Sequence, residues 1–409
     1  MEDFQLYQQI LGLSAPWRVQ KVVLKRAEGE LEIEVACEET DWGCPECHQR
    51  MRAHDTVRRR WRHLDSCQFH TMIVCDVPAV LCPEHGAVTV AVPWAEKFSR
   101  MTRLMERLAI DLMLECSIQA SCQILGLSWD EADGVKQRAV ARGLARKPKV
   151  VPPRVCVDEK SFARGQSYVT VVAAVSADQT TVEQVEPGRA QASLETYWRR
   201  FPEEQLDRVP AVAMDMWAPF LEATRACVPG ADDKICHDPF HLVAHMNQAV
   251  NDVRKAEHRE QAKQGDQTLA GTRQWWLYGQ ENVPEAQAAA FDQIKFLNLR
   301  TARAWGLKEV FRSFWLSPNR PSAQRYFQRW YSWAIRSRLA PVKKVARMCQ
   351  KHLHQILNYF DHRLTNGPIE GLNNKIQGLI KKAYGYRNQQ RFINDIYFHC
   401  GGLDLHPAQ

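Results

Sequence analysis

The spacing of hydrophobic and polar residues divides the chain into stretches that predict different secondary structure. Early in the chain apolar and polar positions alternate, which is the period of strands. This alternation follows a short predicted helix at residues 4–12, and it predicts strands over residues 19–24, 31–35 and 69–75. From Met101 onward apolar residues recur every three or four positions, which predicts helices as far as a proline-rich linker at residues 147–153.

A different rhythm follows this linker. Apolar stretches predict strands over residues 155–157, 168–175, 181–185, 210–214 and 234–236. Helices are predicted over residues 193–201, 219–227 and 241–254. Three strands followed by alternating helices and strands predict a mixed sheet of the α/β class. From residue 256 to 339 the strand signals vanish, so we predict a helical insertion, in which Trp275 and Trp276 are interpreted as core residues.

The composition is that of a protein with several packed domains. The length of 409 residues suggests two to four domains, and 45% apolar with 25% charged residues argues against disorder as the main state. No apolar stretch has the length of a membrane helix, and the acidic start of the chain does not resemble a signal peptide. We therefore expect a cytoplasmic protein.

The net charge of +7 is unevenly distributed. Residues 1–150 carry 20 Lys and Arg against 21 Asp and Glu, whereas residues 151–409 carry 34 against 26. Between Lys343 and Arg391 there are ten basic residues and two acidic ones. A basic excess confined to the C-terminal part of the chain indicates a polyanionic partner for that part.

A dense group of arginines lies in the N-terminal part. Its members are Arg50, Arg52, Arg58, Arg59, Arg60 and Arg62. Such a group is typical of phosphate contact, which makes these residues candidates for binding nucleic acid. A solvated face of a strand or loop would have the same composition, so both interpretations stay open.

Two short motifs have the ligand spacing of a structural zinc site. They are Cys44-Pro-Glu-Cys47 and Cys82-Pro-Glu-His85. Two residues between ligands allow a tight turn to present both side chains to one tetrahedral ion. An odd total of 13 cysteines without a secretory signal favours thiols and metal ligands over disulfides. The alternatives are free thiols in two unrelated turns, or competition from Cys37, Cys67 and Cys75.

Residues 117–131 predict two short helices joined by a turn at Gly126. Ser128 and Glu131 have the spacing of a capping box at the start of the second helix. This arrangement is typical of a helix-turn-helix that places a helix in the major groove. The basic residues of the second helix, and hence its candidates for DNA contact, are Lys136, Arg138 and Arg142. A pair of helices packed through glycine, with no DNA to bind, is the alternative.

Two aspartates stand at the ends of predicted strands, and a glutamate stands at the start of a later helix. Asp158 follows Val155–Val157, and Asp215 follows Ala211–Met214. A buried strand fixes such a carboxylate in the way that metal ligands are held, and two Mg²⁺ ions bridged by aspartates can activate a hydroxyl for phosphodiester chemistry. Glu370 lies in the first turn of a helix that begins near Pro368. The alternative roles are a turn residue for each aspartate and stabilisation of a helix start for the glutamate.

The helix of Glu370 continues with a polar and basic surface. Asn373, Asn374, Gln377 and Lys381 follow Glu370 at roughly helical spacing. Candidates for neutralising phosphates near the third acid are Lys343, Lys344, Lys375, Lys381, Lys382, Arg387 and Arg391.

These motifs together resemble the bacterial insertion-sequence DDE transposases of the ISL3 family, over nearly the whole chain. Besides the cysteine motifs, the segments that carry the resemblance are Val157–Phe162 with Tyr168–Thr170, Ala213–Met216, His237–His241, and Asn366–Ile376 with Ala383–Asn388.

The resemblance implies a multidomain α/β architecture. It implies a zinc-binding β-rich domain (1–95), a helix-turn-helix domain (96–147), and an RNase H-like catalytic domain in two parts (148–255 and 341–409) around an all-helical insertion (256–340). It implies Asp158, Asp215 and Glu370 as the catalytic triad, with Asp238 and His241 supporting the metal ligands or contacting DNA. An aspartate at a helix N-cap beside a satisfied histidine remains the alternative for that pair.

The resemblance also implies cofactors and partners. They are two Mg²⁺ or Mn²⁺ ions for the triad, one structural zinc ion, and double-stranded DNA in the form of inverted-repeat ends and target. We expect strand cleavage and strand transfer by a homodimer on DNA, in a bacterial protein associated with the nucleoid. A non-catalytic DNA-binding regulator would need only the zinc and helix-turn-helix elements, and a nuclease without strand transfer would share the triad.

Overall fold

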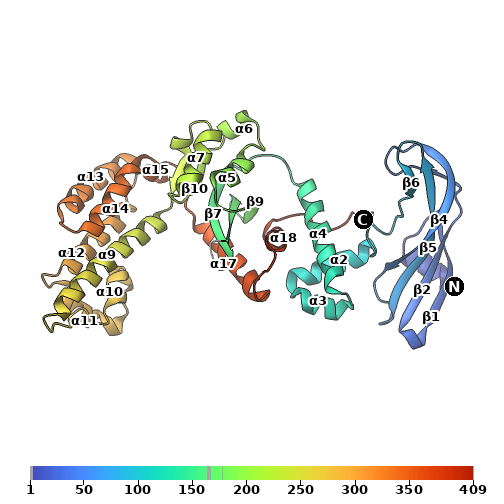
Figure 1. Ribbon diagram of the computed structural model, residues 1–409, viewed down its shortest axis with the longest axis horizontal. Helices are drawn as coiled ribbons and strands as arrows, with labels where there is room; N and C mark the ends of the chain where they lie inside the picture. The colour runs from blue at the N-terminus through green and yellow to red at the C-terminus, as the bar shows by residue number, and fades with distance from the viewer. Residues whose placement is uncertain (1–2, 164–166, 177, 409) are drawn as a thin grey trace. The chain divides into compact units, whose positions relative to one another are not determined.

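The computed structural model describes residues 3–163, 167–176 and 178–408, and it divides the chain into two compact units (Figure 1). The first unit comprises Met1–Lys147 and Leu403–Gln409, and the second comprises Pro148–Gly402. Within the described residues, no helix is long and apolar enough to cross a membrane.

The first unit begins with helix α1 (Asp3–Ile10) and a six-stranded sheet. The strands are β1 (Trp17–Lys25), β2 (Glu30–Cys37), β3 (Asp41–Gly43), β4 (Arg50–Arg62), β5 (His70–Cys82) and β6 (Gly86–Thr89). Their order is β1-β2-β5-β4-β3, with β6 paired to β5. The three strands predicted in this region are confirmed as β1, β2 and β5, and Gly29 turns the β1–β2 hairpin with a φ of 65°.

One face of this sheet is covered by an apolar core. Alternate residues of β2, Leu31, Ile33 and Val35, are buried, as the period of two requires. Tryptophans close the core, because the rings of Trp17 and Trp61 each meet the ring of Trp94 edge to face, at 5.1 and 5.4 Å between centroids.

Three helices follow the sheet: α2 (Arg103–Glu115), α3 (Ile118–Leu125) and α4 (Trp129–Arg146). Each starts with a hydroxyl that caps its backbone, and at α4 Ser128 and Glu131 form the predicted capping box. Gly126 ends α3 in the left-handed conformation, with a φ of 63°. The helix-turn-helix prediction is confirmed at its turn and at both helix starts.

A buried glutamate holds these helices together. Glu106 of α2 is 1% exposed, and its carboxylate accepts hydrogen bonds from the Ser99 hydroxyl and from the guanidinium groups of Arg138 and Arg142 on α4. A buried carboxylate persists only when it is paired in this way. The packing of α2 against α4 therefore depends on this network.

The last residues of the chain also pack against these helices. Arg142 donates to the carbonyl of Leu405, Arg146 pairs with Asp404 at 2.8 Å, and His406 contacts Asp111 at 2.7 Å. The sequence alone placed residues 403–409 with the last part of the catalytic domain, whereas in the structure they belong to the first unit.

Replacing Glu106 by glutamine is expected to destabilise the α2–α4 helices by about 2 kcal/mol, because two arginines lose a buried counter-charge while the shape of the side chain is kept. In the full-length protein, this loss of stability should appear as faster hydrogen exchange of the α2 and α4 amides. Asp130→Asn, at an exposed acid of α4, is the control and should change stability by less than about 0.5 kcal/mol. Exchange at the wild-type rate in Glu106→Gln would contradict the role of this network.

The second unit contains a five-stranded mixed sheet in the order β11-β10-β7-β8-β9. The strands are β7 (Arg154–Ala163), β8 (Ser167–Val175), β9 (Thr180–Pro187), β10 (Ala211–Met214) and β11 (Ile235–His237). The first three are antiparallel, and β10 and β11 run parallel to β7. This confirms the predicted order of strands and helices and the mixed sheet expected of an RNase H-like domain.

Helices cover both faces of this sheet (Figure 1). The helices between strands are α5 (Gln191–Trp198), α6 (Glu203–Asp207), α7 (Ala218–Cys227) and α8 (Ala231–Lys234), and those near the C-terminus are α17 (Gly367–Lys382) and α18 (Gln389–Cys400). On one face Val155 and Val157 pack with α5 and α7, and on the other face Cys156 packs with α17 and α18. Because neighbouring residues of β7 enter different cores, the stretch Val155–Val157 is continuously apolar instead of alternating.

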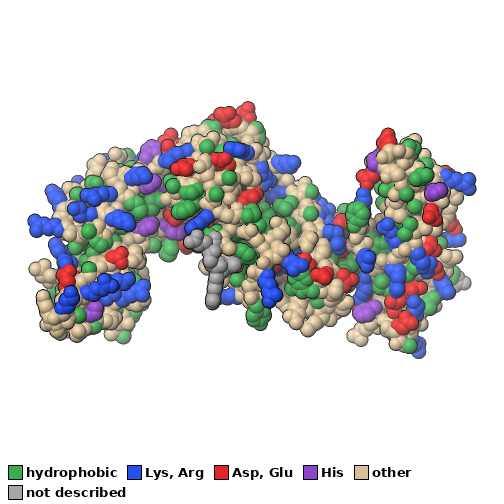
Figure 2. Space-filling model, in the orientation of Figure 1, with side chains coloured by type: hydrophobic (Ala, Val, Ile, Leu, Met, Phe, Trp, Pro, Cys, Tyr) green, Lys and Arg blue, Asp and Glu red, His purple; other side chains and the backbone are tan. Residues whose placement is uncertain are grey.

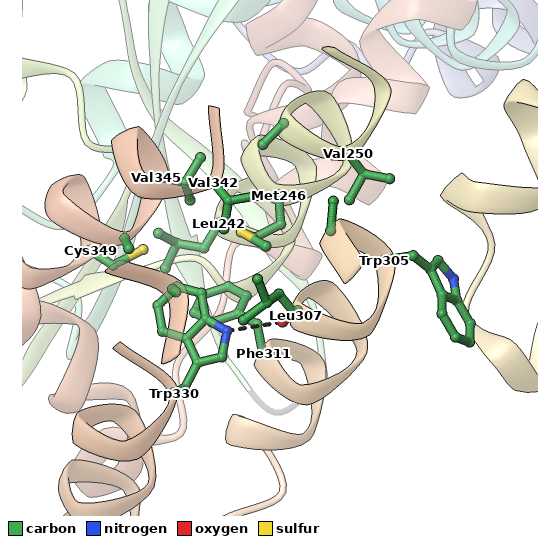
Figure 3. Packing of buried hydrophobic residues seen from close by; sticks show 14 of the residues in the cluster. Leu242, Met246, Val250, Trp305, Leu307, Phe311, Trp330, Val342, Val345 and Cys349 are labelled. Carbon is green, nitrogen blue, oxygen red and sulfur yellow. Dashed lines mark hydrogen bonds between the residues drawn. The ribbon is translucent and has the colours of Figure 1, made fainter. Parts of the chain in front are cut away.

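A bundle of helices is inserted between β11 and α17. Its helices are α9 (Pro239–Ala262), α10 (Arg273–Leu277), α11 (Glu285–Lys295), α12 (Arg300–Phe314), α13 (Arg320–Arg336), α14 (Ala340–Lys351), α15 (Leu353–Leu357) and α16 (Tyr359–His362). Figure 3 shows its core, where the Trp330 indole donates to the carbonyl of Leu307 at 2.9 Å. Trp276 is fully buried, so its interpretation as a core residue is confirmed. The core runs from Leu242 to Phe360, beyond the 256–340 expected from the sequence.

Candidate catalytic and metal sites

Three neighbouring parallel strands, β7, β10 and β11, carry aspartates at one level of the sheet. Asp215 and Asp238 directly follow their strands, whereas β7 runs on past Asp158 to Ala163, so the expectation that Asp158 ends its strand is wrong. Val157, Met214 and His237 occupy paired positions on β7, β10 and β11. The next residue in each case is an acid, namely Asp158, Asp215 and Asp238. Because residues in register on parallel strands lie side by side, the three acids gather at one edge of the sheet, where α/β proteins bind ligands. We call these three residues the acid edge.

Local hydrogen bonds orient the first two acids. One carboxylate oxygen of Asp158 accepts from the backbone N–H of Glu159 at 2.8 Å, and one of Asp215 accepts from the N–H of Met216 at 2.6 Å. The second oxygen of Asp158 accepts from the amide of Asn373 at 2.6 Å. Each aspartate is thus held in orientation by the backbone N–H of the residue that follows it.

Glu370 lies in the first turn of α17, a helix that packs on the sheet beside β7. The buried side chains of Ile369, Leu372 and Ile376 hold the helix on the sheet, and Glu370 is half-buried on another side of it. Asn373, one turn beyond Glu370, is the residue that bonds Asp158. The first turns of α17 therefore lie beside β7, although 212 residues separate Asp158 from Glu370 in the sequence.

Two further contacts hold the start of α17 at the acid edge. Lys160 of β7 donates to the carbonyl of Asn373 at 3.2 Å, and the backbone N–H of Asn366 donates to Asp238 at 3.2 Å. Asp238 occupies the N-cap position of α9 but makes no capping hydrogen bond there. Its carboxylate connects two helices instead of capping one.

His241 faces this group of acids. Its Nδ1 lies 3.4 Å from Oδ2 of Asp238, an ion pair without the geometry of a hydrogen bond. Asp238, followed by Asp215 and Asp158, raises the pKa of His241 to about 9. Burial raises the pKa of Asp158, an effect that the positive charge of His241 opposes. An imidazolium at neutral pH therefore balances part of the negative charge at this edge.

The donor atoms at the acid edge fit a hard divalent cation. Buried oxygens without a hydrogen-bond partner within the described part of the chain are Glu159 Oε2, Asn366 Oδ1 and Asn373 Oδ1, while Asp238 Oδ2 has only its ion pair with His241. Carboxylate and amide oxygens are the ligands that Mg²⁺ and Mn²⁺ prefer. Unpartnered buried oxygens are costly, so their concentration beside the aspartates indicates a place for a cation.

The sequence analysis missed Arg189, an arginine that connects the residues following Asp158 and Asp215. The guanidinium of Arg189 pairs with Glu159 at 2.9 Å and stacks on the rings of Tyr168 and Trp217, 4.1 and 4.7 Å from their centroids. The Trp217 indole donates back to the carbonyl of Arg189 at 3.0 Å. The only sequence signal was an aromatic residue two positions after Asp215.

The zinc ligands predicted from the sequence come together in the first unit. The ligand atoms of Cys44, Cys47, Cys82 and His85 all lie within 4.8 Å of one another, with Cys47 and Cys82 sulfurs 3.6 Å apart. Burial acts to raise the pKa of Cys82, but hydrogen bonds led by His85 lower it to about 6. Three sulfurs and one imidazole nitrogen at these distances fit a tetrahedral zinc ion.

The competing cysteines do not join this cluster. Cys75 is buried in the core of the sheet, where burial raises the pKa of its thiol to about 12. Cys37 lies at the end of β2, and Cys67 is exposed. The ligand set is therefore the one that the doublet spacing predicted.

Four of the six arginines on β4 pair with acids of the first unit, Arg50 among them with Glu39 at 3.5 Å. Arg58 pairs with Glu34 at 3.3 Å, Arg60 with Glu30 at 2.8 Å, and Arg62 with Asp65. Arg59 instead donates to the Thr89 hydroxyl. These pairs compensate part of the charge of the group on an exposed strand face, and its contact with DNA stays a prediction.

The basic residues of α4 point into the first unit. Lys136 is 5% exposed, the side chain of Arg142 is 9% exposed, and Arg138 binds Glu106. These buried or paired positions favour a structural role for the three residues. On and after α17 the predicted residues are solvent-accessible: Asn374, Lys375, Lys381, Lys382 and Arg387.

The acid edge on a mixed sheet, the helix-turn-helix and the zinc cluster together define a DNA transposase of the DDE class. A family model described as a transposase of the DDE type matches residues 155–396. The helix-turn-helix domain of transposase family ISL3 matches residues 90–140, and the zinc-finger of transposases IS204, IS1001, IS1096 and IS1165 matches residues 40–85. The chain belongs to the ISL3 family of transposases.

Two similar proteins of known name agree with this assignment. The chain is 27% identical over 376 residues to the transposase for insertion sequence element IS1557 of Mycobacterium tuberculosis, covering 86% of this chain and 84% of that protein. It is 26% identical over 356 residues to the transposase for insertion sequence element IS1001 of Bordetella parapertussis, covering 86% of each.

Proposed function

We propose that this transposase cleaves DNA at the inverted-repeat ends of its insertion sequence and joins those ends to target DNA. Asp158, Asp215 and Glu370 are the catalytic residues, and they hold two Mg²⁺ or Mn²⁺ ions. The observation that supports this proposal is the shared register of β7 and β10, which carry Asp158 and lead to Asp215, together with the hydrogen bond to Asp158 from Asn373, one turn after Glu370.

The residues around the triad have distinct tasks in this proposal. When bound, the metal ions would activate the attacking hydroxyl and stabilise the leaving oxygen. Asn373 orients Asp158, Asp238 fixes the start of α17 through Asn366, and the positive charge of His241 favours the approach of a phosphate. The exposed cations after Glu370, including Lys381 and Arg387, neutralise neighbouring phosphates.

The first unit supplies recognition of the DNA ends. A structural zinc ion held by the four ligands stabilises the β-rich part, and the helix-turn-helix contacts the ends. Because two ends must be held together for joining, we expect a homodimer on DNA. The boundaries 1–95, 96–147, 148–255, 256–340 and 341–409 are kept as the proposed domains, with the last seven residues returning to the first unit.

Incubation of the full-length protein with a duplex that contains an inverted-repeat end tests this function. Strand cleavage is expected with Mg²⁺ or Mn²⁺ and none with EDTA, and joined products are expected when target DNA is added. DNA binding without cleavage under any divalent ion would favour the regulator, and cleavage without joining would favour the nuclease.

A further inference from the structure

The insertion contains a long stretch without acidic residues. Between Glu309 and Asp361 the sequence has no Asp or Glu, but it has ten Lys and Arg. This stretch includes all of α13 and α14, and Figure 2 shows Lys and Arg side chains over these helices with few acidic side chains among them. The proposed catalytic acids do not explain why so many positive charges, without acids between them, are concentrated in this stretch.

Three arginines of this stretch lie on one face of α13. Arg325, Arg329 and Arg336 are spaced by four and seven residues, which places them in a row along the helix. All three are exposed, and together with Gln328 and Ser332 they line a shallow hollow of about 490 Å³. We call these three residues the arginine face. The opposite side of α13 is buried in the core of the insertion through Ala323, Phe327, Trp330 and Ala334.

The arginine face differs from other arginines of the insertion in its partners. Arg320, in the same helix, binds Asn358 and Asp361, and Arg312 pairs with Glu309 at 3.0 Å. Within the described residues, no carboxylate pairs with a member of the arginine face. Arg325 and Arg336 donate to the hydroxyls of Ser322 and Ser332 in their own helix, which orients them without cancelling their charge.

We infer that the arginine face binds the sugar-phosphate backbone of double-stranded DNA, as a contact separate from the acid edge and from the helix-turn-helix. The inference rests on the proposed function, since it assumes that DNA is the polyanion that this protein handles. From Arg325 to Arg336 the helix rises about 16 Å, which matches the rise of about five nucleotides of one strand. A row of guanidinium groups over that length contacts phosphates and carries no sequence information.

The salt dependence of DNA binding tests this inference. The full-length protein is titrated with a long duplex of arbitrary sequence, with EDTA present to prevent cleavage, over a series of salt concentrations. In the triple variant Arg325→Gln, Arg329→Gln and Arg336→Gln, the slope of log affinity against log salt is expected to fall in magnitude by about 2 to 3, because each lost phosphate contact removes about 0.9. A slope equal to that of the wild-type protein would overturn the inference.

Two further triple variants control for net charge. Arg199→Gln, Arg208→Gln and Arg259→Gln remove the same number of charges from other exposed positions of the second unit, and the slope should stay close to that of the wild-type protein. Replacement of the arginine face by lysines keeps the charge, and the slope should be retained. If the control and the arginine-face variants lose slope equally, a general charge effect replaces the inference.

Folding and function are separated by two more measurements. Should the triple variant unfold, the single substitution Arg329→Gln at an exposed position is expected to lower the slope by about 0.9. Failure of the wild-type protein to cleave an end-containing duplex would count against the proposed function alone. An unchanged slope in the variants, in a protein that cleaves, would count against the arginine face alone.

Discussion

Replacing Asp215 by asparagine is expected to slow strand cleavage by about a thousandfold while DNA binding remains. Charge stabilisation through a bound metal contributes several kcal/mol to the transition state, and each 1.36 kcal/mol corresponds to about tenfold in rate. The amide oxygen of asparagine can still accept from the N–H of Met216, so the turn after β10 keeps its shape. Single-turnover cleavage of an end-containing duplex with Mg²⁺ measures the rate. Asp158→Asn and Glu370→Gln should show losses of similar size.

Controls separate a metal ligand from a merely structural acid. Glu204→Gln changes an exposed acid of α6 in the same unit and should leave the rate unchanged. Asp215→Cys offers a softer ligand, so partial recovery is expected with Mn²⁺ and none with Mg²⁺. Full activity of Asp215→Asn, or equal losses in Glu204→Gln, would exclude the proposed triad.

The sequence was sufficient for features that are local. Asp158 and Asp215 could be singled out because each directly follows a short apolar stretch, and the parallel pairing of β7 with β10 aligns the ends of these two stretches. The capping box of α4 and the cysteine doublets were equally visible, since all their atoms lie within one turn of chain. The prediction of Glu370 depended on its sequence motif, because the packing of α17 near Asp158 is a contact between distant parts of the chain.

Features that depend on distant partners could not be predicted. The arginines of β4 were counted as one charged group, but their charges are compensated by Glu30 and Glu34 of β2, with β5 between the two strands. Arg138 and Arg142 were predicted to lie on an exposed basic helix, but their partners are the buried carboxylate of Glu106 and, for Arg142, the carbonyl of Leu405. Arg189 was missed for the same reason, since Glu159 lies on β7 and Trp217 lies at the start of α7.

Substituting Cys47 by serine, or removing zinc with a chelator, is expected to unfold the β3–β4 and β5–β6 turns of the first unit. A structural zinc site contributes on the order of 10 kcal/mol, and a hydroxyl does not replace a thiolate ligand. Because Cys82 ends β5, loss of the ion also releases this end of the strand and its pairing with β6. Metal analysis of the purified protein should give one zinc ion per chain for wild type and less for Cys47→Ser. Hydrogen exchange of residues 40–90 should rise in parallel.

The chain offers a matched control for this loss. Cys67 is an exposed cysteine outside the ligand cluster, so Cys67→Ser should retain zinc and wild-type exchange. Binding of end-containing DNA should weaken in Cys47→Ser, because the zinc-stabilised sheet supports the helix-turn-helix within the first unit, where Arg62 of β4 contacts the carbonyl of Leu125. Amides of β7, β8 and β10 should exchange as in wild type, since they belong to the second unit. A protein without zinc, in which Cys47→Ser changes neither exchange nor binding, would rule out the site.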